Sequence, residues 1–323
     1  MLFIGSCAGS FIAFDKLSGD IRWSYDIRQD GDQSYFHGDF HFSDGRVLTA
    51  SDGQEFGTVY AFDQVTGAVR WRHSEPEAIT STVVQGGANV HVITEADQVL
   101  ALDRDSGAIR WRFRTQGNPT GRTRLVSSPA VDDRHVYVSG RDGTLYALEI
   151  ARGAVAWTLD LETPFITAPG LWQGSLYIGS REGHVIRVDT GSGAVQAEID
   201  IESAVYVGDE LSVIDGRIYV YAGIAPGTSA PAELVSVEPS LNAVRWRHTS
   251  EHGWSTPRAY YWNGEIIVGD VAGNVIGLNP GDGSLVESFT VDGQPRGIGA
   301  DGDVLFVGTI DGMLYAYRMR AGG

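Results

Sequence analysis

The chain has 323 residues, of which 42% are hydrophobic, enough for two ordinary domains or for one large all-β domain with a substantial core. Its 24 basic and 41 acidic residues give a formal net charge of −17, and Lys16 is the only lysine. A surface this acidic repels nucleic acid, so we expect no nucleic-acid partner.

Cysteine content and apolar runs exclude further classes of protein. Cys7 is the only cysteine, which rules out an internal disulfide and a multi-cysteine zinc site. No apolar run approaches the roughly 18 residues of a membrane-spanning helix, so we expect no transmembrane segment. The residues after Met1 read as a strand and not as a signal peptide.

A short unit recurs along the chain. One copy reads VYVSGRDGTLYALEIARGAVAW from Val136, with two apolar runs joined by a turn at Asp142-Gly143. Glycine readily adopts the positive φ of such turns, so each copy predicts a tight antiparallel hairpin. In chain order the copies begin at Leu2, Val47, Val90, Val136, Leu176, Ile218, Ile266 and Leu305.

A five-residue turn follows each of the first seven hairpins. In five copies an acidic residue opens the turn and glycine closes it, as in Asp63 and Gly67, whereas the sixth copy closes with Asn242. A carboxylate accepts hydrogen bonds from turn amides, and glycine and asparagine tolerate left-handed φ. Four residues after the closing positions stand Trp23, Trp71, Trp111, Trp157, Ala197, Trp246 and Glu287.

The strand that carries these tryptophans alternates between two faces. Residues 109–114 place Ile, Trp and Phe on one side and three arginines on the other. We interpret the arginines as the solvated face of an outer strand, where charge prevents edge-to-edge pairing, and not as a nucleic-acid patch. A further strand precedes each hairpin after the first, as in residues 127–138 and 167–178.

Four antiparallel strands that recur every 40 to 49 residues are typical of a β-propeller. We therefore predict an all-β, eight-bladed β-propeller of four-stranded antiparallel blades that occupies residues 1–323 as a single domain. The first blade lacks its innermost strand, and the last blade lacks its outermost strand. Either these incomplete blades close the ring, or Met1 is not the natural start of the protein.

The repeat pattern resembles a known family. The pattern [YF]-A-[LF]-D-x-x-[TS]-G-x-[VI]-x-W, seen in YAFDQVTGAVRW from Tyr60 and LALDRDSGAIRW from Leu100, resembles the quinoprotein-like β-propellers with PQQ-like repeats and tryptophan-docking motifs. The resemblance covers essentially the whole chain. It implies that each tryptophan docks one blade onto the next, and that Ala197 and Glu287 mark looser contacts.

The resemblance implies two kinds of function. Pyrroloquinoline quinone (PQQ) dehydrogenases hold the quinone and a calcium ion in this ring. Non-enzymatic relatives, which include the propeller lipoprotein of the outer-membrane assembly machine and sensor domains of kinases, hold other proteins. Adjacent cysteines are frequent in one dehydrogenase branch, whereas this chain has Cys7 alone. The chain is also shorter than typical alcohol-oxidising members.

We therefore expect a monomeric, non-catalytic binding or scaffold module for protein–protein assembly, with no cofactor. The alternatives are a PQQ- and calcium-dependent dehydrogenase and the sensor domain of a larger signalling protein. Relatives are mostly extracytoplasmic, which is the location that the resemblance implies, although no signal peptide is present in the chain.

Loop lengths single out one face of the propeller. Insertions fall between blades, in residues 27–38 and 114–125, and in the hairpin turns of residues 54–57 and 223–232, which all emerge on the same face. Variable loops on a rigid scaffold commonly form binding sites, so we expect this face to contact a protein or peptide. The candidate binding residues there are Tyr35, His37, Asp39, Arg122, Arg124, Phe165, Tyr206, Trp254 and Arg296.

Other motifs in the sequence give weaker signals of function than the loops do. His37, Asp39 and His41 alternate along one strand face and could hold a metal, but a hydrogen-bonded polar start of a strand explains them equally, and we expect no metal site. No GxSxG, P-loop or HExxH motif is present, so no catalytic residue is expected. Cys7 aligns with Arg181 of another repeat and is interpreted as a turn residue and not as a lipid anchor.

Overall fold

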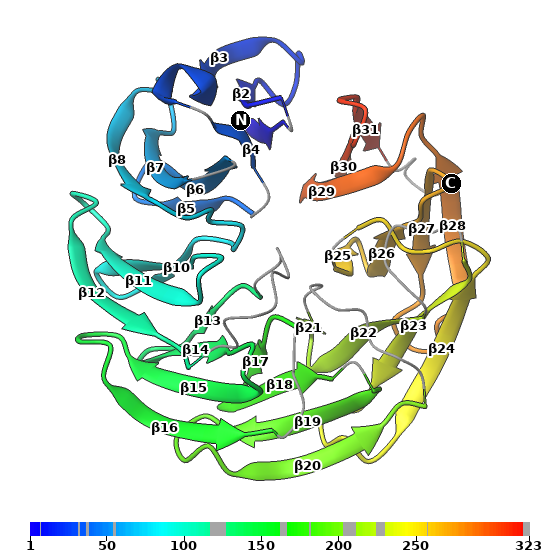
Figure 1. Cartoon of the computed structure of the whole chain (residues 1–323). Helices are drawn as coiled ribbons and strands as arrows, with labels where there is room; N and C mark the ends of the chain where they lie inside the picture. The colour runs from blue at the N-terminus through cyan, green and yellow to red at the C-terminus, as the bar shows by residue number, and fades with distance from the viewer. Residues whose placement is uncertain are drawn as a thin grey trace. The chain divides into compact units, whose positions relative to one another are not determined.

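The computed structural model describes residues 1–6, 8–31, 33–36, 39–53, 56–116, 127–161, 167–180, 182–202, 211–223, 230–256 and 258–318. Within these ranges all regular elements are β-strands except one 3-10 turn, η1 (Ile27–Asp30). The strands form eight antiparallel sheets in chain order, and each sheet is one propeller blade (Figure 1). The predicted all-β, eight-bladed propeller is confirmed, including the three strands of the first and last blades.

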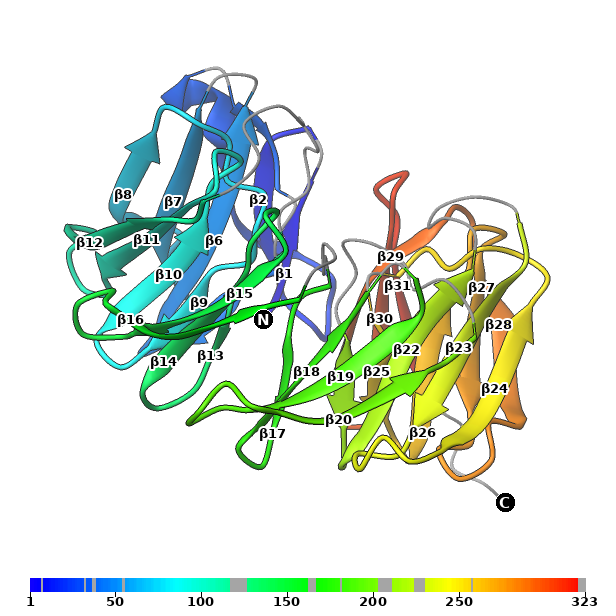
Figure 2. The same ribbon diagram turned by 60° about the horizontal axis from the view of Figure 1, so that its bottom comes forward.

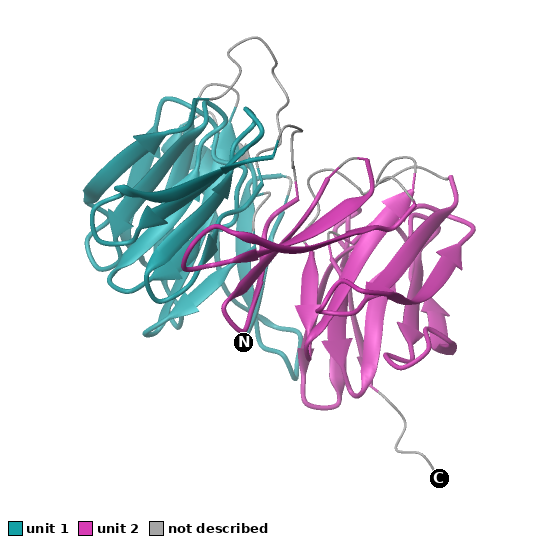
Figure 3. Ribbon diagram, turned by 90° about the horizontal axis from the view of Figure 1, so that it is seen from below, with its two compact units in different colours: residues 1–165 teal, residues 166–323 magenta. Residues whose placement is uncertain are grey.

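Two compact units divide the blades equally (Figure 3). Unit 1, Met1–Phe165, contains blades 1 to 4, and unit 2, Ile166–Gly323, contains blades 5 to 8. The strands of a complete blade are called A to D in chain order. In blade 2 two short strands, β4 and β5, both pair with strand B.

The strands of unit 1 are, in blade 1, β1 (Leu2–Gly5), β2 (Ser10–Phe14) and β3 (Ile21–Asp26); in blade 2, β4 (Gln33–Tyr35), β5 (His41–Ser43), β6 (Arg46–Gly53), β7 (Gly57–Asp63) and β8 (Val69–Glu75); in blade 3, β9 (Val84–Gly86), β10 (Asn89–Ile93), β11 (Gln98–Asp103) and β12 (Ile109–Arg114); and in blade 4, β13 (Ala130–Val131), β14 (His135–Ser139), β15 (Thr144–Glu149) and β16 (Val155–Asp160).

The strands of unit 2 are, in blade 5, β17 (Gly170–Trp172), β18 (Ser175–Gly179), β19 (His184–Asp189) and β20 (Val195–Asp200); in blade 6, β21 (Ser212–Ile214), β22 (Arg217–Gly223), β23 (Ala232–Val237) and β24 (Val244–Ser250); in blade 7, β25 (Tyr260–Trp262), β26 (Glu265–Gly269), β27 (Asn274–Leu278) and β28 (Leu285–Thr290); and in blade 8, β29 (Pro295–Asp301), β30 (Val304–Thr309) and β31 (Leu314–Arg318).

Burial follows the position of a strand in its blade. Residues 59–62 of β7, a C strand, are all 0% exposed, because neighbouring blades cover both faces of the sheet. In β12, a D strand, Trp111 is buried while Arg110 and Arg112 are exposed. Apolar side chains from successive blades thus form the core of each unit, as Trp71, Ile79 and Leu102 do between blades 2 and 3.

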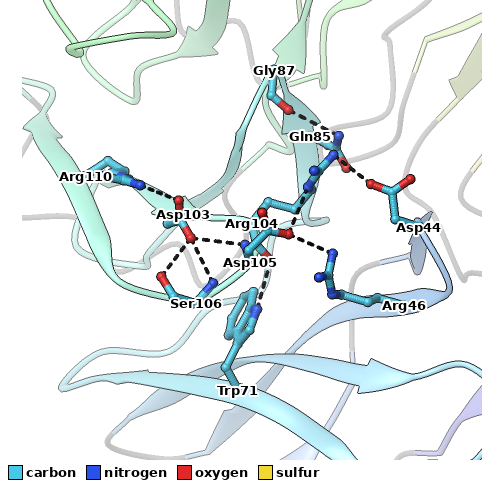
Figure 4. A network of polar contacts seen from close by, with 10 residues as sticks. All are labelled: Asp44, Arg46, Trp71, Gln85, Gly87, Asp103, Arg104, Asp105, Ser106 and Arg110. Carbon is cyan, nitrogen blue, oxygen red and sulfur yellow. Dashed lines mark hydrogen bonds and ion pairs between the residues drawn. The ribbon is translucent and has the colours of Figure 1, made fainter.

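Tryptophans of strand D dock neighbouring blades within each unit. The indole Nε1 of Trp71 donates to the carbonyl oxygen of Arg104 at 2.9 Å (Figure 4). The ring of Trp71 lies against Gly107 in the next blade. A Cβ atom on Gly107 would lie 2.5 Å from the ring, so both the φ of 71° and the indole require glycine here. The same contacts join Trp23 to Gly67, Trp111 to Gly153 and Trp246 to Gly283.

The acidic residue of the five-residue turn satisfies its amides. Asp103 Oδ1 accepts from the backbone N–H groups of Asp105 and Ser106 at 3.1 and 2.8 Å, and Oδ2 accepts from Arg110 at 2.5 Å (Figure 4). The hydrogen bond from Arg110, followed by those from Ser106, holds the pKa of Asp103 well below its usual range. Side chains of the turn and of the adjacent strand β12 therefore hold the turn that receives the indole.

Antiparallel pairing places the turns at two opposite ends of every sheet. Figure 2 shows successive strands of a blade running in opposite directions, so the A–B and C–D turns lie at one end. The B–C turns and the connections between blades lie at the other end, which we call the loop face of a unit. Among the described residues, no helix is long and apolar enough to span a membrane.

Candidate functional site

Four of the nine candidate binding residues lie in the described ranges. Tyr35 and Asp39 belong to unit 1, and Trp254 and Arg296 belong to unit 2. The other five lie outside the described residues, namely His37, Arg122, Arg124, Phe165 and Tyr206.

The two candidates in unit 1 differ in what they present to solvent. The side chain of Tyr35, at the end of β4, is 42% exposed. Asp39 is partly buried, and its backbone N–H donates to Thr82 Oγ1 at 3.2 Å. The N–H of Thr82 in turn donates to Ser128 Oγ at 3.0 Å, so hydrogen bonds connect the segments that precede the A strands of blades 2 to 4.

Trp254 belongs to the core of unit 2. Its ring is 1% exposed and stacks on Tyr221 with a centroid separation of 5.5 Å and an interplanar angle of 19°. The hydroxyls of Tyr221 and Thr256, 2.8 Å apart, continue this contact. The Trp254 side chain therefore packs in the core of unit 2 and offers no surface to a partner.

Arg296 is exposed and is held beside the Trp254 segment. Its Nη1 donates to the carbonyl oxygen of Ser255, the residue that follows Trp254, at 3.0 Å. Arg296 follows Pro295, which pairs with Thr309 at the end of β30. The backbone of Arg296 consequently lies near the end of β30, where the B–C hairpin turn of blade 8 begins.

That hairpin carries two exposed apolar side chains, Ile310 at 55% and Met313 at 52%. The N–H of Ile310 donates to the carbonyl oxygen of Gln294 at 3.0 Å, which ties the hairpin to the connection before β29. Apolar groups beside an arginine are common at protein interfaces. We call Arg296, Ile310 and Met313 the blade-8 patch.

The sequence does not single out Ile310 and Met313, although it contains a signal for them. In blade 4 the corresponding hairpin positions are polar, with Arg141 and Thr144 on either side of Asp-Gly. Blade 8 has the same Asp-Gly turn with apolar residues on both sides. A comparison of turn residues between repeats would have found them.

Unit 1 contains a cluster of paired charged groups around the buried Glu75. Glu75 is 5% exposed and accepts two hydrogen bonds of 2.7 Å from Arg112, while His73 Nε2 lies 2.5 Å away. Burial alone would raise the pKa of Glu75, but the hydrogen bonds from Arg112 and His73 outweigh it and hold the pKa below its usual range. This cluster joins blade 2 to blade 3, and we interpret it as a contact that stabilises the fold and not as a binding site.

The described part of the chain contains no group of three or more His, Cys, Asp or Glu side chains placed to hold a metal ion. His41 lies in β5, while His37 is outside the described residues. The metal hypothesis for these two histidines is thus untested.

Eight antiparallel blades and repeated tryptophan–glycine contacts define a β-propeller with tryptophan-docking repeats. The model of the family described as outer membrane protein assembly factor BamB matches residues 7–220 and 121–296, and the chain belongs to this family. Among curated proteins no sequence match to the chain is found.

Solved structures share the fold along nearly the whole chain. BamB from Moraxella catarrhalis is similar with a TM-score of 0.78 and 22% identity, over 98% of this chain and 93% of that protein. The computationally designed Ika8 protein has a TM-score of 0.79 and 16% identity, over 98% and 92% of the two chains. A quinohemoprotein alcohol dehydrogenase from Pseudomonas putida HK5 has a TM-score of 0.71 and 13% identity, over 94% and 68%. An assembly factor, a designed protein and an enzyme share this backbone. The structural similarity is therefore evidence for the fold and not for an activity.

Proposed function

We propose that this chain is a non-catalytic binding module that takes part in the assembly of outer membrane proteins, outside the cytoplasm. The observation that carries the proposal is membership, over residues 7–296, of the family described as an outer membrane protein assembly factor. The blade-8 patch supports it, because the patch presents apolar and cationic groups on the loop face of unit 2.

The mechanism is preorganisation of the contact surface. The Ile310 backbone is held by the carbonyl oxygen of Gln294, and the Arg296 side chain is held by the carbonyl oxygen of Ser255, next to the buried Trp254 in the chain. Ordering loops and side chains costs free energy on association, and groups that are held in place beforehand avoid part of that cost. A partner would therefore bind a surface that needs little rearrangement.

Site-specific photo-crosslinking in the host cell tests this function. With p-benzoylphenylalanine in place of Ile310, we expect crosslinks to a component of the outer-membrane assembly apparatus. Ile21 is a matched control, because it is apolar, 60% exposed and at the opposite end of its sheet. Equal crosslinking from both positions, or none from Ile310, would contradict the proposal.

A PQQ- and calcium-dependent dehydrogenase is the second candidate function, and the likeness to the quinohemoprotein alcohol dehydrogenase favours it. Purified protein incubated with PQQ and calcium would then bind the quinone, with a visible absorbance change after gel filtration, and would reduce a dye in the presence of an alcohol. The binding-module proposal predicts neither signal.

A further inference from the structure

The D strands of the blades differ in the charge of their exposed side chains. Each of the seven described D strands pairs with one C strand and has no other strand beside it among the described residues. The face opposite the docking position carries the residue before that position and the first and third residues after it, as Arg110, Arg112 and Arg114 are placed in β12. Charge at such positions of an edge strand prevents pairing with a further strand.

The D strand of blade 7, β28, has no charge on this face. Val286, Ser288 and Thr290 occupy the three positions, and all of them are exposed. Leu285, 57% exposed, adds a second apolar side chain beside Val286, which is 52% exposed. Glu287, the one charged residue of β28, lies on the opposite face at the docking position. Each of the other six D strands carries a charge at these positions, for example Arg22 in β3, Arg72 in β8, Arg112 in β12, Asp160 in β16, Glu198 in β20 and Arg247 in β24.

The hydrogen-bond register shows which backbone groups of β28 point away from its sheet. The N–H of Val291 donates to the carbonyl oxygen of Gly273 at 2.9 Å, so these two residues form a hydrogen-bonded pair just beyond the strand. Hydrogen-bonded and non-hydrogen-bonded pairs alternate along antiparallel strands. Thr290 and Ser288 stand one and three residues before Val291, so both direct their backbone N–H and C=O groups to the outer edge.

The edge of β28 is a feature of unit 2 alone. Blade 7 stands between blades 6 and 8 of the same unit, and its A strand, β25, lies against the A strands of both neighbours. β28 is at the other end of the same sheet and therefore on the outer side of the unit (Figure 1). The edge is thus open to a strand that approaches from outside.

Two exposed carboxylates bracket the uncharged strand. Asp282 lies in the C–D turn before β28, and Asp292 lies two residues beyond the end of the strand. Asp282 accepts hydrogen bonds from the hydroxyl and the N–H of Ser284 at 2.6 and 3.0 Å, which hold the pKa of Asp282 below its usual value. Basic residues near the ends of an added strand would face these carboxylates. The formal net charge of −17 favours such a partner and disfavours a second copy of the chain.

We propose that the outer edge of β28 binds an extended segment of a second protein, which adds as a fifth strand of blade 7. The segment has β-branched and hydroxyl side chains at its centre and a basic residue near each end. Its backbone forms hydrogen bonds with Ser288 and Thr290, and its central side chains contact Val286. Its basic ends face Asp282 and Asp292. This outer edge is separate from the blade-8 patch on the loop face, so the inference goes beyond the proposed function.

A short peptide with these features is a suitable probe. An acetylated, amidated and fluorescently labelled peptide Lys-Thr-Val-Thr-Val-Thr-Lys is expected to bind the full-length protein at one saturable site. N-methyl groups on two adjacent central amides block both edges of the peptide and should weaken binding about tenfold. A peptide with glutamate in place of both lysines should also bind more weakly, and this difference should shrink as the salt concentration rises.

Variants of the protein test the edge from the other side. Ser288→Arg gives β28 the residue that β12 has at the same position, Arg112, so the substitution has a precedent in the fold. We expect it to weaken peptide binding about tenfold, because the guanidinium guards the edge and repels the basic ends. Thr158→Arg, at the same position of β16, is the matched control and should leave binding unchanged. Asp292→Asn should weaken binding about twofold to threefold at low salt, whereas Asp160→Asn in β16 should not.

Hydrogen exchange gives an independent readout. The amides of Ser288 and Thr290 should exchange fast in the isolated protein and slow down when the peptide is bound. Slow exchange without peptide would mean that another part of the chain covers the edge, and a dimer that Ser288→Arg dissociates would mean that a second copy does. Either result, or equal peptide binding by Ser288→Arg and wild type, overturns the proposal. None of these outcomes bears on crosslinking from Ile310.

Discussion

Arg187 donates a hydrogen bond to the carbonyl oxygen of Pro239 at 3.2 Å, at the turn position where Arg104 receives the indole of Trp71. Ala197 stands at the tryptophan position of this blade and pairs with Arg187 across the sheet. Asn242, and not glycine, closes the turn of blade 6. The docking tryptophan and the closing glycine are thus both absent at this contact, whereas each indole that docks in the other blades lies against a glycine without a Cβ atom.

Truncation of this arginine measures the strength of the substitute contact. Arg187→Ala removes one donor to Pro239, while the hydroxyl of Tyr177 still donates to the same oxygen at 2.9 Å. We expect a loss of about 1 to 2 kcal/mol in the free energy of unfolding, measured by chemical denaturation. The exposed Arg134 is the control, and its replacement by alanine should change stability by less than about 0.5 kcal/mol.

The tryptophan–glycine contact predicts a coupled pair of mutations. Gly107→Ala requires both a left-handed alanine and a shift of the Trp71 ring, and Gly19→Ala requires only the first, because nothing lies within 4 Å of its Cβ position. We expect about 1 to 2 kcal/mol of destabilisation for Gly19→Ala and about 1 to 3 kcal/mol more for Gly107→Ala. The two glycines have similar φ values, 76° and 71°.

The double mutant separates the cost of a left-handed alanine from the cost of the clash with the Trp71 ring. Trp71→Ala alone should cost about 3 to 5 kcal/mol. In its background the cost of Gly107→Ala should fall to that of Gly19→Ala, because the clash is absent. Additive costs in thermal or chemical unfolding would show that the indole does not select glycine at this position.

The fold was predictable because its determinants are local. The Asp-Gly hairpins, the acid-to-glycine turns and the alternation in residues 109–114 each lie within a few residues, and they specify strands, turns and their order. The role of Arg187 was not predictable in this way, because Arg187 reaches an acceptor 52 residues away in the chain.

The loop face of each unit was predictable only in outline. Long connections and hairpin turns indicate one end of the blades, and the strand directions place them there. The sequence does not reveal that Trp254 is buried, since an isolated tryptophan in a long connection belongs to no periodic pattern. Exposure of Ile310 likewise depends on the hairpin that presents it.

The buried carboxylate Glu75 predicts a large effect of removing its partner. Arg112→Ala leaves this side chain, 5% exposed, with His73 alone, and we expect a loss of about 3 to 5 kcal/mol in the free energy of unfolding. Arg114→Ala is the control in the same strand, because its guanidinium lies 3.9 Å from Glu77 and is 61% exposed. A similar small loss for both variants in urea denaturation would refute the structural role of the Glu75 cluster.

The pH dependence of Glu75 follows from the direction of its shift. Its pKa is below the usual value in the folded protein, so the stabilisation it provides is present above the pKa of the unfolded chain and is lost as the pH falls through the folded value. The wild-type protein should therefore lose stability below about pH 4.5, the ordinary glutamate value. The double variant Glu75→Gln, Arg112→Met should lose less over the same range.

His91 predicts pH dependence in a higher window. The side chain, in β10, is 0% exposed and lies against Trp111 with a ring centroid separation of 5.4 Å. Burial lowers the pKa of His91 to about 4 from an ordinary value of 6.5, and the backbone of Val84 opposes the shift to a smaller extent. Between these two pH values the unfolded chain binds a proton that the folded chain excludes.

A fall in pH below 6.5 therefore destabilises the folded protein through His91. Stabilisation from the neutral imidazole is complete above pH 6.5 and declines as the pH falls toward 4, by about 1.4 kcal/mol per pH unit and by about 3 kcal/mol in total. We expect His91→Leu to remove this component, so that wild type loses about 3 kcal/mol more than the variant between pH 7 and pH 4 in chemical denaturation. Parallel stability curves for the two proteins would mean that His91 is protonated as readily in the folded chain as in the unfolded one.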